Sequence, residues 1–211
     1  MTHFIPIFPL KLVTYPNEKV SLHVFEDRYK ELMNDCFEQG MTFGIPVHIN
    51  GKIMKYGTEL ELESIQKTYE DGRMDVVCRG KRTFKIAEIF KNAPDKLYSG
   101  ADVIFVKEDK RGDYMKALTI LDKLEYMYKM LKSKRTVPSD PGQLYSFDIG
   151  HHVGFSVNQE YQLLSLETEG KRLHMILKHL EHLIPMVEET ERLREKASLN
   201  GHFKNIIPPE V

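Results

Sequence analysis

The most constraining feature of this sequence is a change of hydrophobic period near residue 110. Before that point, short runs of β-branched and aromatic residues alternate with turn dipeptides, as strands and hairpins do. After it, apolar residues return every three or four positions, which is the period of an amphipathic helix. We therefore expect an α+β chain with two modules: a β-rich module over residues 1–110 and a helical bundle over residues 111–211.

Tight turns separate the strand-like runs of the first half. The dipeptides Asn50-Gly51 and Asp71-Gly72 favour two-residue hairpins. Short strands with tight turns and no helical crossovers predict an antiparallel sandwich or barrel. The predicted strands are 3–8, 20–25, 43–49, 52–56, 58–69, 73–79, 82–91 and 98–106.

Helical periodicity appears once in the first half and dominates the second. Residues 26–39 carry one apolar stripe, ending at Gly40. In the second half we expect helices over 113–132, 143–153, 157–166 and 170–198, the third opened by a capping box at Ser156 and Gln159. Pro185 should kink or split the longest helix, and residues 200–211 should form an irregular tail. The expected buried positions are Tyr29, Leu32, Met33, Cys36 and Phe37 in the first helix, Ala117, Leu121, Leu124, Tyr128 and Leu131 in the second, and Leu173, Ile176, Leu177, Leu180, Ile184 and Val187 in the last.

The charge balance argues against a dedicated nucleic-acid binder. Lys plus Arg number 30 and Asp plus Glu number 31, whereas proteins that neutralise phosphates usually carry a basic excess. The basic cluster at Lys132, Lys134 and Arg135 ends a predicted helix, where positive charge suits the helix dipole. Two distant cysteines, Cys36 and Cys78, are typical of reduced thiols, and with no signal or membrane segment they predict a cytoplasmic protein.

The chain shows no constellation that points to catalysis, a cofactor or a metal. No nucleotide-binding glycine loop or nucleophile elbow occurs. The histidines at 174, 179 and 182 lie beside the apolar stripe of a helix and do not have the usual zinc spacing, and the pair at 151 and 152 diverges on a helix. The glutamates at 59, 61 and 63 form a row that we interpret as a solvated strand face. We expect no enzyme activity, no cofactor and no metal site.

Six short elements in the first half occur in a familiar order. They are Ile5-Pro-Ile-Phe-Pro-Leu10, Leu22-His-Val-Phe-Glu-Asp-Arg-Tyr29, Phe43-Gly44-Ile45-Pro46, Tyr56-Gly57-Thr58, Asp71-Gly72-Arg73 and Gly80-Lys-Arg-Thr-Phe84. Together they resemble the substrate-binding domain that opens the ATP-dependent Lon proteases. The last element departs from the family pattern, because Thr83 stands where the family has arginine and Arg82 precedes it.

This resemblance implies a fold and a function. The family has a PUA-like β pseudo-barrel followed by a C-terminal helical bundle, in agreement with the two periods described above. In full-length Lon an ATPase module and a serine–lysine protease module follow, and neither is present in these 211 residues. The resemblance therefore implies a stand-alone, non-catalytic member that binds unfolded or partner proteins in protein quality control, either as a chaperone-like holder or as an adaptor for a separate protease.

Two segments are candidates for the protein-binding surface. On the helix over 113–132, Met115, Tyr126 and Met130 form a second apolar stripe away from the predicted buried face. The alternative is that this helix is buried on both sides. The second candidate is a pair of loop regions that contain Tyr15, Met41 and Phe43.

The residues of the family motifs have an ordinary structural interpretation. Glu26 suits the start of a helix, Arg28 can pair with a carboxylate or carbonyls across the barrel, and Tyr29 and Phe84 are interpreted as structural residues of the motif. We expect the glycines at turns or bulges that require a positive φ angle; they are Gly44, Gly57, Gly72 and Gly80. The alternative function is an RNA-binding module, because PUA-like barrels elsewhere bind RNA.

Overall fold

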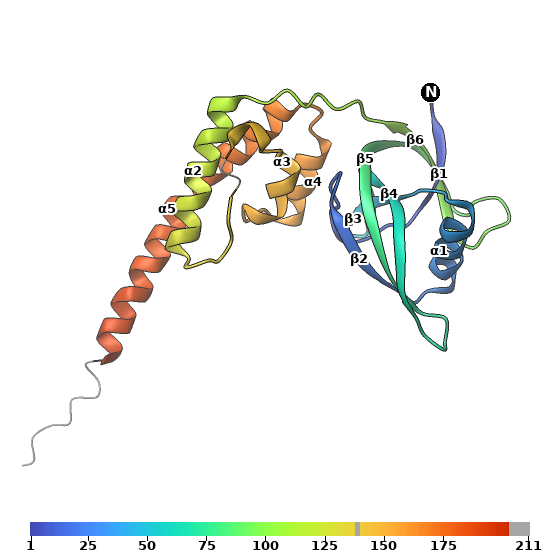
Figure 1. Cartoon of the computed structure of the whole chain (residues 1–211), viewed down its shortest axis with the longest axis horizontal. Coiled ribbons are helices and arrows are strands. Elements are labelled where there is room, and N and C mark those ends of the chain that lie inside the picture. Colours follow the sequence, from blue (N-terminus) through green and yellow to red (C-terminus); the bar gives the residue numbers. More distant parts are fainter. Residues whose placement is uncertain (138–139, 203–211) are drawn as a thin grey trace, which may run out of the picture. The chain divides into compact units, whose positions relative to one another are not determined.

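Six strands and one helix form the first part of the chain. The computed structural model describes residues 1–137 and 140–202, with side chains as far as Ser198. The chain begins with β1 (His3–Ile7), β2 (Lys19–Val24), α1 (Asp27–Gln39), β3 (Phe43–Ile49), β4 (Lys52–Thr68), β5 (Met74–Phe90) and β6 (Ser99–Phe105) (Figure 1). The fold class is α+β, as expected, but four of the predicted strands merge into two. The pairs 52–56 with 58–69 and 73–79 with 82–91 form the long strands β4 and β5, whose bulges absorb the irregular positions.

The strands close into a ring. Pairing runs from β5 through β4, β3, β1 and β6, and β6 pairs with β5 again. Every pairing is antiparallel except β1 with β3, so the sheet is mixed and not purely antiparallel as predicted. The long β5 makes closure possible, because its second half pairs with β6 while its first half pairs with β2. β2 therefore lies outside the ring.

The barrel core is apolar and includes one face of α1. Leu32, Met33 and Cys36 of α1 join Phe43, Ile45 and Leu60 of the strands in a single buried cluster. Tyr29 stacks on Phe8 with ring centroids 3.7 Å apart. Phe37 does not belong to this face, contrary to the helical pattern: it is 68% exposed, at the edge of the stripe. α1 ends at Gly40, whose φ of 65° is the left-handed conformation that a glycine cap provides.

Short helices and one long helix follow the barrel. They are α2 (Tyr114–Met130), η1 (Pro141–Gln143), α3 (Ser146–Ile149), η2 (Gly150–His152), α4 (Val157–Ser165) and α5 (Glu169–His202). The predicted helix over 143–153 is thus broken into three short turns, whereas the capping box at Ser156 and Gln159 is present. α5 passes through Pro185 without a split and continues to His202, so residues 200–202 are helical and the rest of the predicted tail lies outside the described residues. None of the described helices is both long and apolar enough to cross a membrane.

The chain forms two compact units whose limits differ from the expected division. One unit contains Met1–Lys110 and Phe147–Glu169, and the other contains Arg111–Ser146 and Gly170–Val211. The first segment of the barrel unit ends at Lys110, and residues 147–169 return to that unit. Phe147 stacks on Tyr15 at 4.9 Å, and the Tyr56 N–H donates to the Tyr161 hydroxyl at 3.4 Å. Helical periodicity does not reveal which neighbour a helix packs against, so this return was not predicted.

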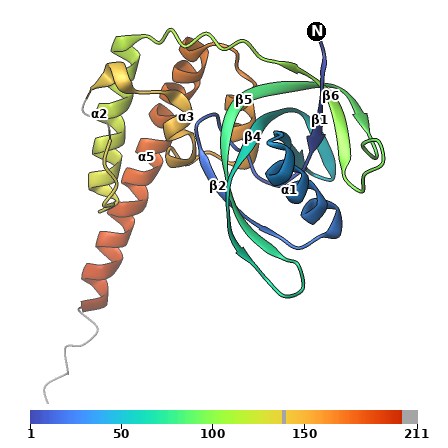
Figure 2. The ribbon, with the colours of Figure 1, turned by 45° about the vertical axis from the view of Figure 1, so that its right-hand side comes forward.

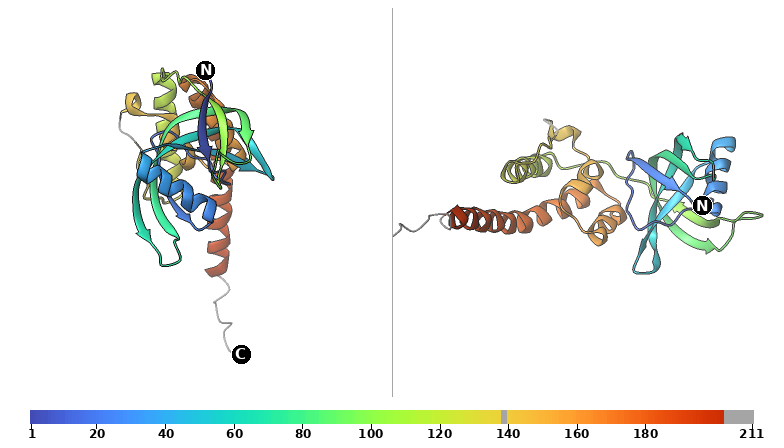
Figure 3. Two further views of the ribbon diagram at one scale, coloured as in Figure 1. Left: turned by 90° about the vertical axis from the view of Figure 1, so that its right-hand side faces the viewer. Right: turned by 90° about the horizontal axis from the view of Figure 1, so that it is seen from below.

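Within the second unit, α2 and α5 lie side by side (Figure 2). α5 extends beyond the last turn of α2 (Figure 3). Of the expected stripe on α5, four members are buried: Leu173, Ile176, Leu180 and Ile184. Leu177 and Val187 are only partly buried.

Candidate functional site

α2 carries exposed apolar side chains on the face opposite its buried one. Met115 is 65% exposed and Tyr126 is 51% exposed, while Met130 is partly exposed. The opposite face is buried through Ala117, Ile120, Leu121, Leu124, Met127 and Tyr128. Within the second unit, this face of α2 is therefore exposed. We call Met115, Tyr126 and Met130 the α2 stripe; the three residues lie on one helical face, as their spacing predicts.

A hydrogen bond holds one member of the stripe in place. The Tyr126 hydroxyl donates to Oε1 of Glu188 on α5 at 2.7 Å. That hydrogen bond to a carboxylate raises the pKa of the Tyr126 hydroxyl. An aromatic ring with a fixed hydroxyl and an accessible face provides contact area at low entropic cost. Leu131, which the periodicity placed on the buried face, is 44% exposed because α2 has already ended at Met130.

The second predicted surface is wrong in two of its three residues. Tyr15 and Phe43 are fully buried. Phe43 belongs to the barrel core, where a strand places alternate side chains inward. Only Met41 remains partly exposed, in a surface hollow of about 460 Å³ that Phe4, Pro6, Thr42 and Pro94 also line.

Tyr15 instead belongs to a partly buried network that the sequence did not reveal. The His151 ring lies 4.6 Å from the Tyr15 ring, with Nδ1 2.7 Å from Glu160 Oε1 and Nε2 3.2 Å from Glu18 Oε2. The Tyr15 N–H donates to Glu18 at 2.8 Å, and its hydroxyl donates to the Glu160 carbonyl oxygen at 3.2 Å. Burial disfavours the imidazolium, but the two carboxylates outweigh burial and raise the pKa of His151 to about 9. The partners are up to 145 residues apart, so no local pattern reveals them.

The strand glutamates form cross-strand ion pairs, and only Glu59 departs from the predicted solvated face. Glu61 pairs with Lys81 at 2.6 Å, and Glu63 pairs with both Arg79 and Lys19. Glu59 pairs with Arg82 at 2.6 Å, and its side chain is almost completely buried, which contradicts the predicted wet face. Its second partner, the Thr42 hydroxyl, donates at 2.8 Å. These partners keep the carboxylates engaged in structure, and nothing in the geometry pairs two of them for acid–base chemistry.

Arg82, which stands one position before the arginine of the family motif, has structural partners of its own. Its guanidinium carbon lies 3.4 Å from the centroid of the Phe105 ring, and its Nε donates to Glu59. Thr83 is buried beside it. The arginine one position early therefore has an ion-pair partner and an aromatic partner on the barrel.

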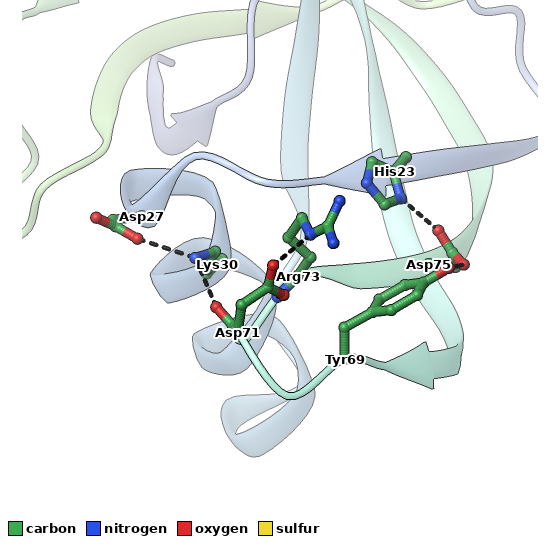
Figure 4. Close-up of polar contacts among 7 residues, drawn as sticks. All are labelled: His23, Asp27, Lys30, Tyr69, Asp71, Arg73 and Asp75. Carbon is green, nitrogen blue, oxygen red and sulfur yellow. Dashed lines mark hydrogen bonds and ion pairs between the residues drawn. The ribbon is translucent and has the colours of Figure 1, made fainter.

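The hairpin between β4 and β5 is held by a polar cluster (Figure 4). Lys30 of α1 donates to the Asp71 carbonyl oxygen at 3.2 Å, and Arg73 Nε donates to the Asp71 carboxylate at 2.6 Å. His23 Nδ1 lies 2.6 Å from Asp75 Oδ1, and the Tyr69 hydroxyl donates to Asp75 Oδ2 at 2.8 Å. The hydrogen bonds from His23 and then Tyr69 lower the pKa of the Asp75 carboxyl.

The remaining motif residues have structural contacts. Arg28 pairs with Glu26 at 2.6 Å beside α1, and not across the barrel, and its guanidinium carbon lies 4.6 Å from the Tyr29 ring centroid. Phe84 is fully buried. Of the four motif glycines, only Gly72 has a positive φ, at 78°.

The other three motif glycines have a different role from the one predicted. Gly44, Gly57 and Gly80 lie within strands at places where a side chain would collide with a neighbour. A Cβ atom on Gly80 would stand 2.2 Å from the Tyr15 carbonyl oxygen, and one on Gly57 would stand 2.5 Å from the Ile45 carbonyl oxygen. These glycines therefore permit close backbone approach.

No group of three metal-ligating side chains converges in the part of the chain that the structure describes. Cys36 and Cys78 are both free and buried. Burial raises the pKa of each thiol to about 12, which keeps both protonated and poorly nucleophilic.

Comparison with known proteins decides the family. The family model for the ATP-dependent protease La (LON) substrate-binding domain matches residues 5–182. The chain belongs to the Lon substrate-binding domain family. This confirms the resemblance drawn from the six motifs.

Two solved structures of Lon N-terminal domains share the fold. A Lon N-terminal domain protein from Xanthomonas campestris is 23% identical, with a TM-score of 0.63, and the match covers 83% of this chain and 98% of that one. The N-terminal domain of a Mycobacterium avium complex Lon protease is 14% identical, with a TM-score of 0.65, and the match covers 85% of this chain and 98% of that one. Similarity at these identities supports the expected fold of a β barrel and C-terminal helices.

Proposed function

We propose that this chain is a non-catalytic polypeptide-binding module that holds unfolded or partner proteins. The observation that carries the proposal is the α2 stripe, in which Met115 and Tyr126 are more than half exposed on a helix whose other face is buried. Exposed apolar side chains of this kind mark interaction surfaces. Methionine adapts to varied apolar partners, and tyrosine is enriched where binding energy concentrates.

The family match supports the same class of ligand. The matching model describes the substrate-binding part of an ATP-dependent protease. In the proposal this chain supplies recognition, and chemistry is left to a separate protease for which it serves as an adaptor in cytoplasmic protein quality control. The two thiols are buried and the strand carboxylates lie in ion pairs, so the proposal assigns no chemical step to these groups.

The alternative of an RNA-binding barrel has less support. Cations on the barrel lie in ion pairs with carboxylates, among them Lys19, Arg79, Lys81, Arg82 and Lys96. A cation that is already paired releases fewer counterions on binding phosphate. This arrangement does not favour a track for a nucleic-acid backbone.

Titration of a permanently unfolded, fluorescently labelled protein tests the proposal. We expect anisotropy to rise with micromolar affinity and to be unaffected by a structured RNA competitor. The variant Met115→Ser/Tyr126→Ser should weaken binding, whereas Phe37→Ser, which removes an equally exposed ring from α1, should not. Absence of binding to the unfolded protein, or displacement by the RNA with a steep salt dependence, contradicts the proposal.

A further inference from the structure

β2 has one paired edge and one open edge. Among the described residues it pairs with β5 only, and it stands at the end of the strand order, outside the closed ring. Figure 4 shows β2, which carries His23, beside β5, which carries Asp75. The strand contains neither proline nor a bulge, which are two of the devices that protect such an edge.

The register decides which main-chain groups face the open edge. In an antiparallel pair, successive residues direct their N–H and C=O groups alternately toward the partner and away from it. The Gly80 N–H donates to the Glu18 carbonyl oxygen at 2.9 Å, and the pairing continues with Lys19 opposite Arg79. The even-numbered residues of β2 therefore face β5. The N–H and C=O groups of Lys19, Ser21 and His23 face the open edge, and all three residues are exposed.

We infer that the open edge of β2 binds an extended polypeptide segment, which joins the barrel as an additional antiparallel strand. This inference rests on the proposed polypeptide-binding function and names a site and a conformation for it. An extended backbone offers complementary donors and acceptors at the strand spacing. The outward N–H and C=O groups of Lys19, Ser21 and His23 therefore favour an extended segment. Antiparallel pairing is the more stable arrangement per residue.

Charge and exposure at the two ends of β2 define the segment further. At the first end, Lys19 and Arg79 share the single carboxylate of Glu63, which leaves an excess of positive charge. At the other end, Phe25 is 61% exposed and stacks near the His23 ring at 6.4 Å. Lys19 and Phe25 lie six residues apart, and therefore on the same face of an extended chain. An antiparallel partner thus carries an apolar residue opposite Phe25 and an acidic residue six positions later, opposite Lys19.

A pair of variants at Ser21 tests the hydrogen bonding. Ser21→Pro removes an N–H that faces outward and leaves the ladder to β5 intact, whereas Ser21→Ala keeps that N–H. The probe is a fluorescent eleven-residue peptide with leucine and glutamate six positions apart. We expect Ser21→Pro to weaken its binding at least about tenfold, since a hydrogen bond is lost and the peptide approaches less closely. Ser21→Ala should bind like the original chain, and urea unfolding of both variants checks that the barrel is folded.

Two modified peptides and one charge reversal complete the test. N-methyl groups on the peptide residues that face β2 should abolish binding, and the same groups on the alternate residues should not. Lys19→Glu should favour the peptide in which lysine replaces glutamate. Equal binding by a folded Ser21→Pro variant, or indifference to the position of the N-methyl groups, overturns the inference. If sedimentation shows that the original chain is a dimer and that Ser21→Pro is not, the open edge binds a second copy of this chain. That outcome also overturns the inference.

The unfolded-protein titration separates this inference from the proposed function. Suppose that Ser21→Pro binds the unfolded protein as the original chain does, while the Met115→Ser/Tyr126→Ser variant does not. The inference about the β2 edge is then wrong, and the proposed function stands. If the original chain binds neither the peptide nor the unfolded protein, both fail.

Discussion

Nδ1 of His151 lies 2.7 Å from Oε1 of Glu160, while Nε2 of the same ring lies 3.2 Å from Oε2 of Glu18. One imidazolium thus joins a barrel loop to α4 through two carboxylates. The Tyr15 ring packs against it, and its hydroxyl also reaches the Glu160 backbone. This network explains why residues 147–169 belong to the barrel unit although they follow α2 in the chain.

Replacing His151 should destabilise the barrel unit. His151→Asn removes the charge and shortens the side chain, so at least one charged hydrogen bond is lost and two carboxylates are left without their shared cation. We expect the free energy of unfolding to fall by about 1.5–3 kcal/mol, measured by urea denaturation. His174→Asn, at an exposed histidine, is the control and should change it little. Equal stability of the two variants would contradict a structural role for the network.

The same residue should make stability depend on pH. Because the folded pKa of His151, about 9, is raised above its ordinary value of 6.5, the folded state binds the proton more tightly than the unfolded state. The stabilisation is fully present below pH 6.5 and is lost as the pH rises through 9. Urea unfolding between pH 6 and 10 should show this decline, and the slope should be smaller in His151→Asn. A parallel decline in both proteins would assign the effect to other groups.

Adding a methyl group at Gly80 should be costly. A Cβ atom there would stand 2.2 Å from the Tyr15 carbonyl oxygen, so backbone must move in Gly80→Ala. We expect a loss of about 1–3 kcal/mol in the free energy of unfolding. Gly170→Ala is the matched control, since no atom lies within 4 Å of the new Cβ, and it should be neutral or slightly stabilising. Thermal unfolding of the two variants measures the difference, and a fully stable Gly80→Ala would refute the close-approach argument.

Tyr126 should separate packing from binding. Tyr126→Phe removes the hydroxyl that donates to Glu188 but keeps the ring exposed. The affinity for the unfolded protein should stay within about twofold, and the free energy of unfolding should fall by no more than about 1 kcal/mol. Tyr126→Ser removes the ring and should weaken binding of the unfolded protein. Anisotropy titration and urea unfolding measure the two effects. Loss of binding in a stable Tyr126→Phe variant would mean that the hydroxyl contacts the client.

The linear order of residues determined much of this protein. The change of period near residue 110, the two-residue hairpin at Asn50-Gly51 and the capping box at Ser156 follow from spacings of two, three or four residues, whereas the loop at Asp71-Gly72 is longer than the two residues predicted. Such features depend on neighbours within one turn or one strand, and local chemistry specifies them. Six short motifs in order were enough to indicate the family.

Only the tertiary structure decided which distant segments meet. It buried Tyr15 and Phe43, placed Glu59 beside Arg82, returned residues 147–169 to the barrel and left β2 outside the ring. Each outcome depends on a contact between residues far apart in the chain, and periodicity carries no information about such partners. A strand pattern predicts one wet face and one dry face. Whether both of its edges are paired depends on how the whole sheet closes, and in this protein closure leaves one edge of β2 open.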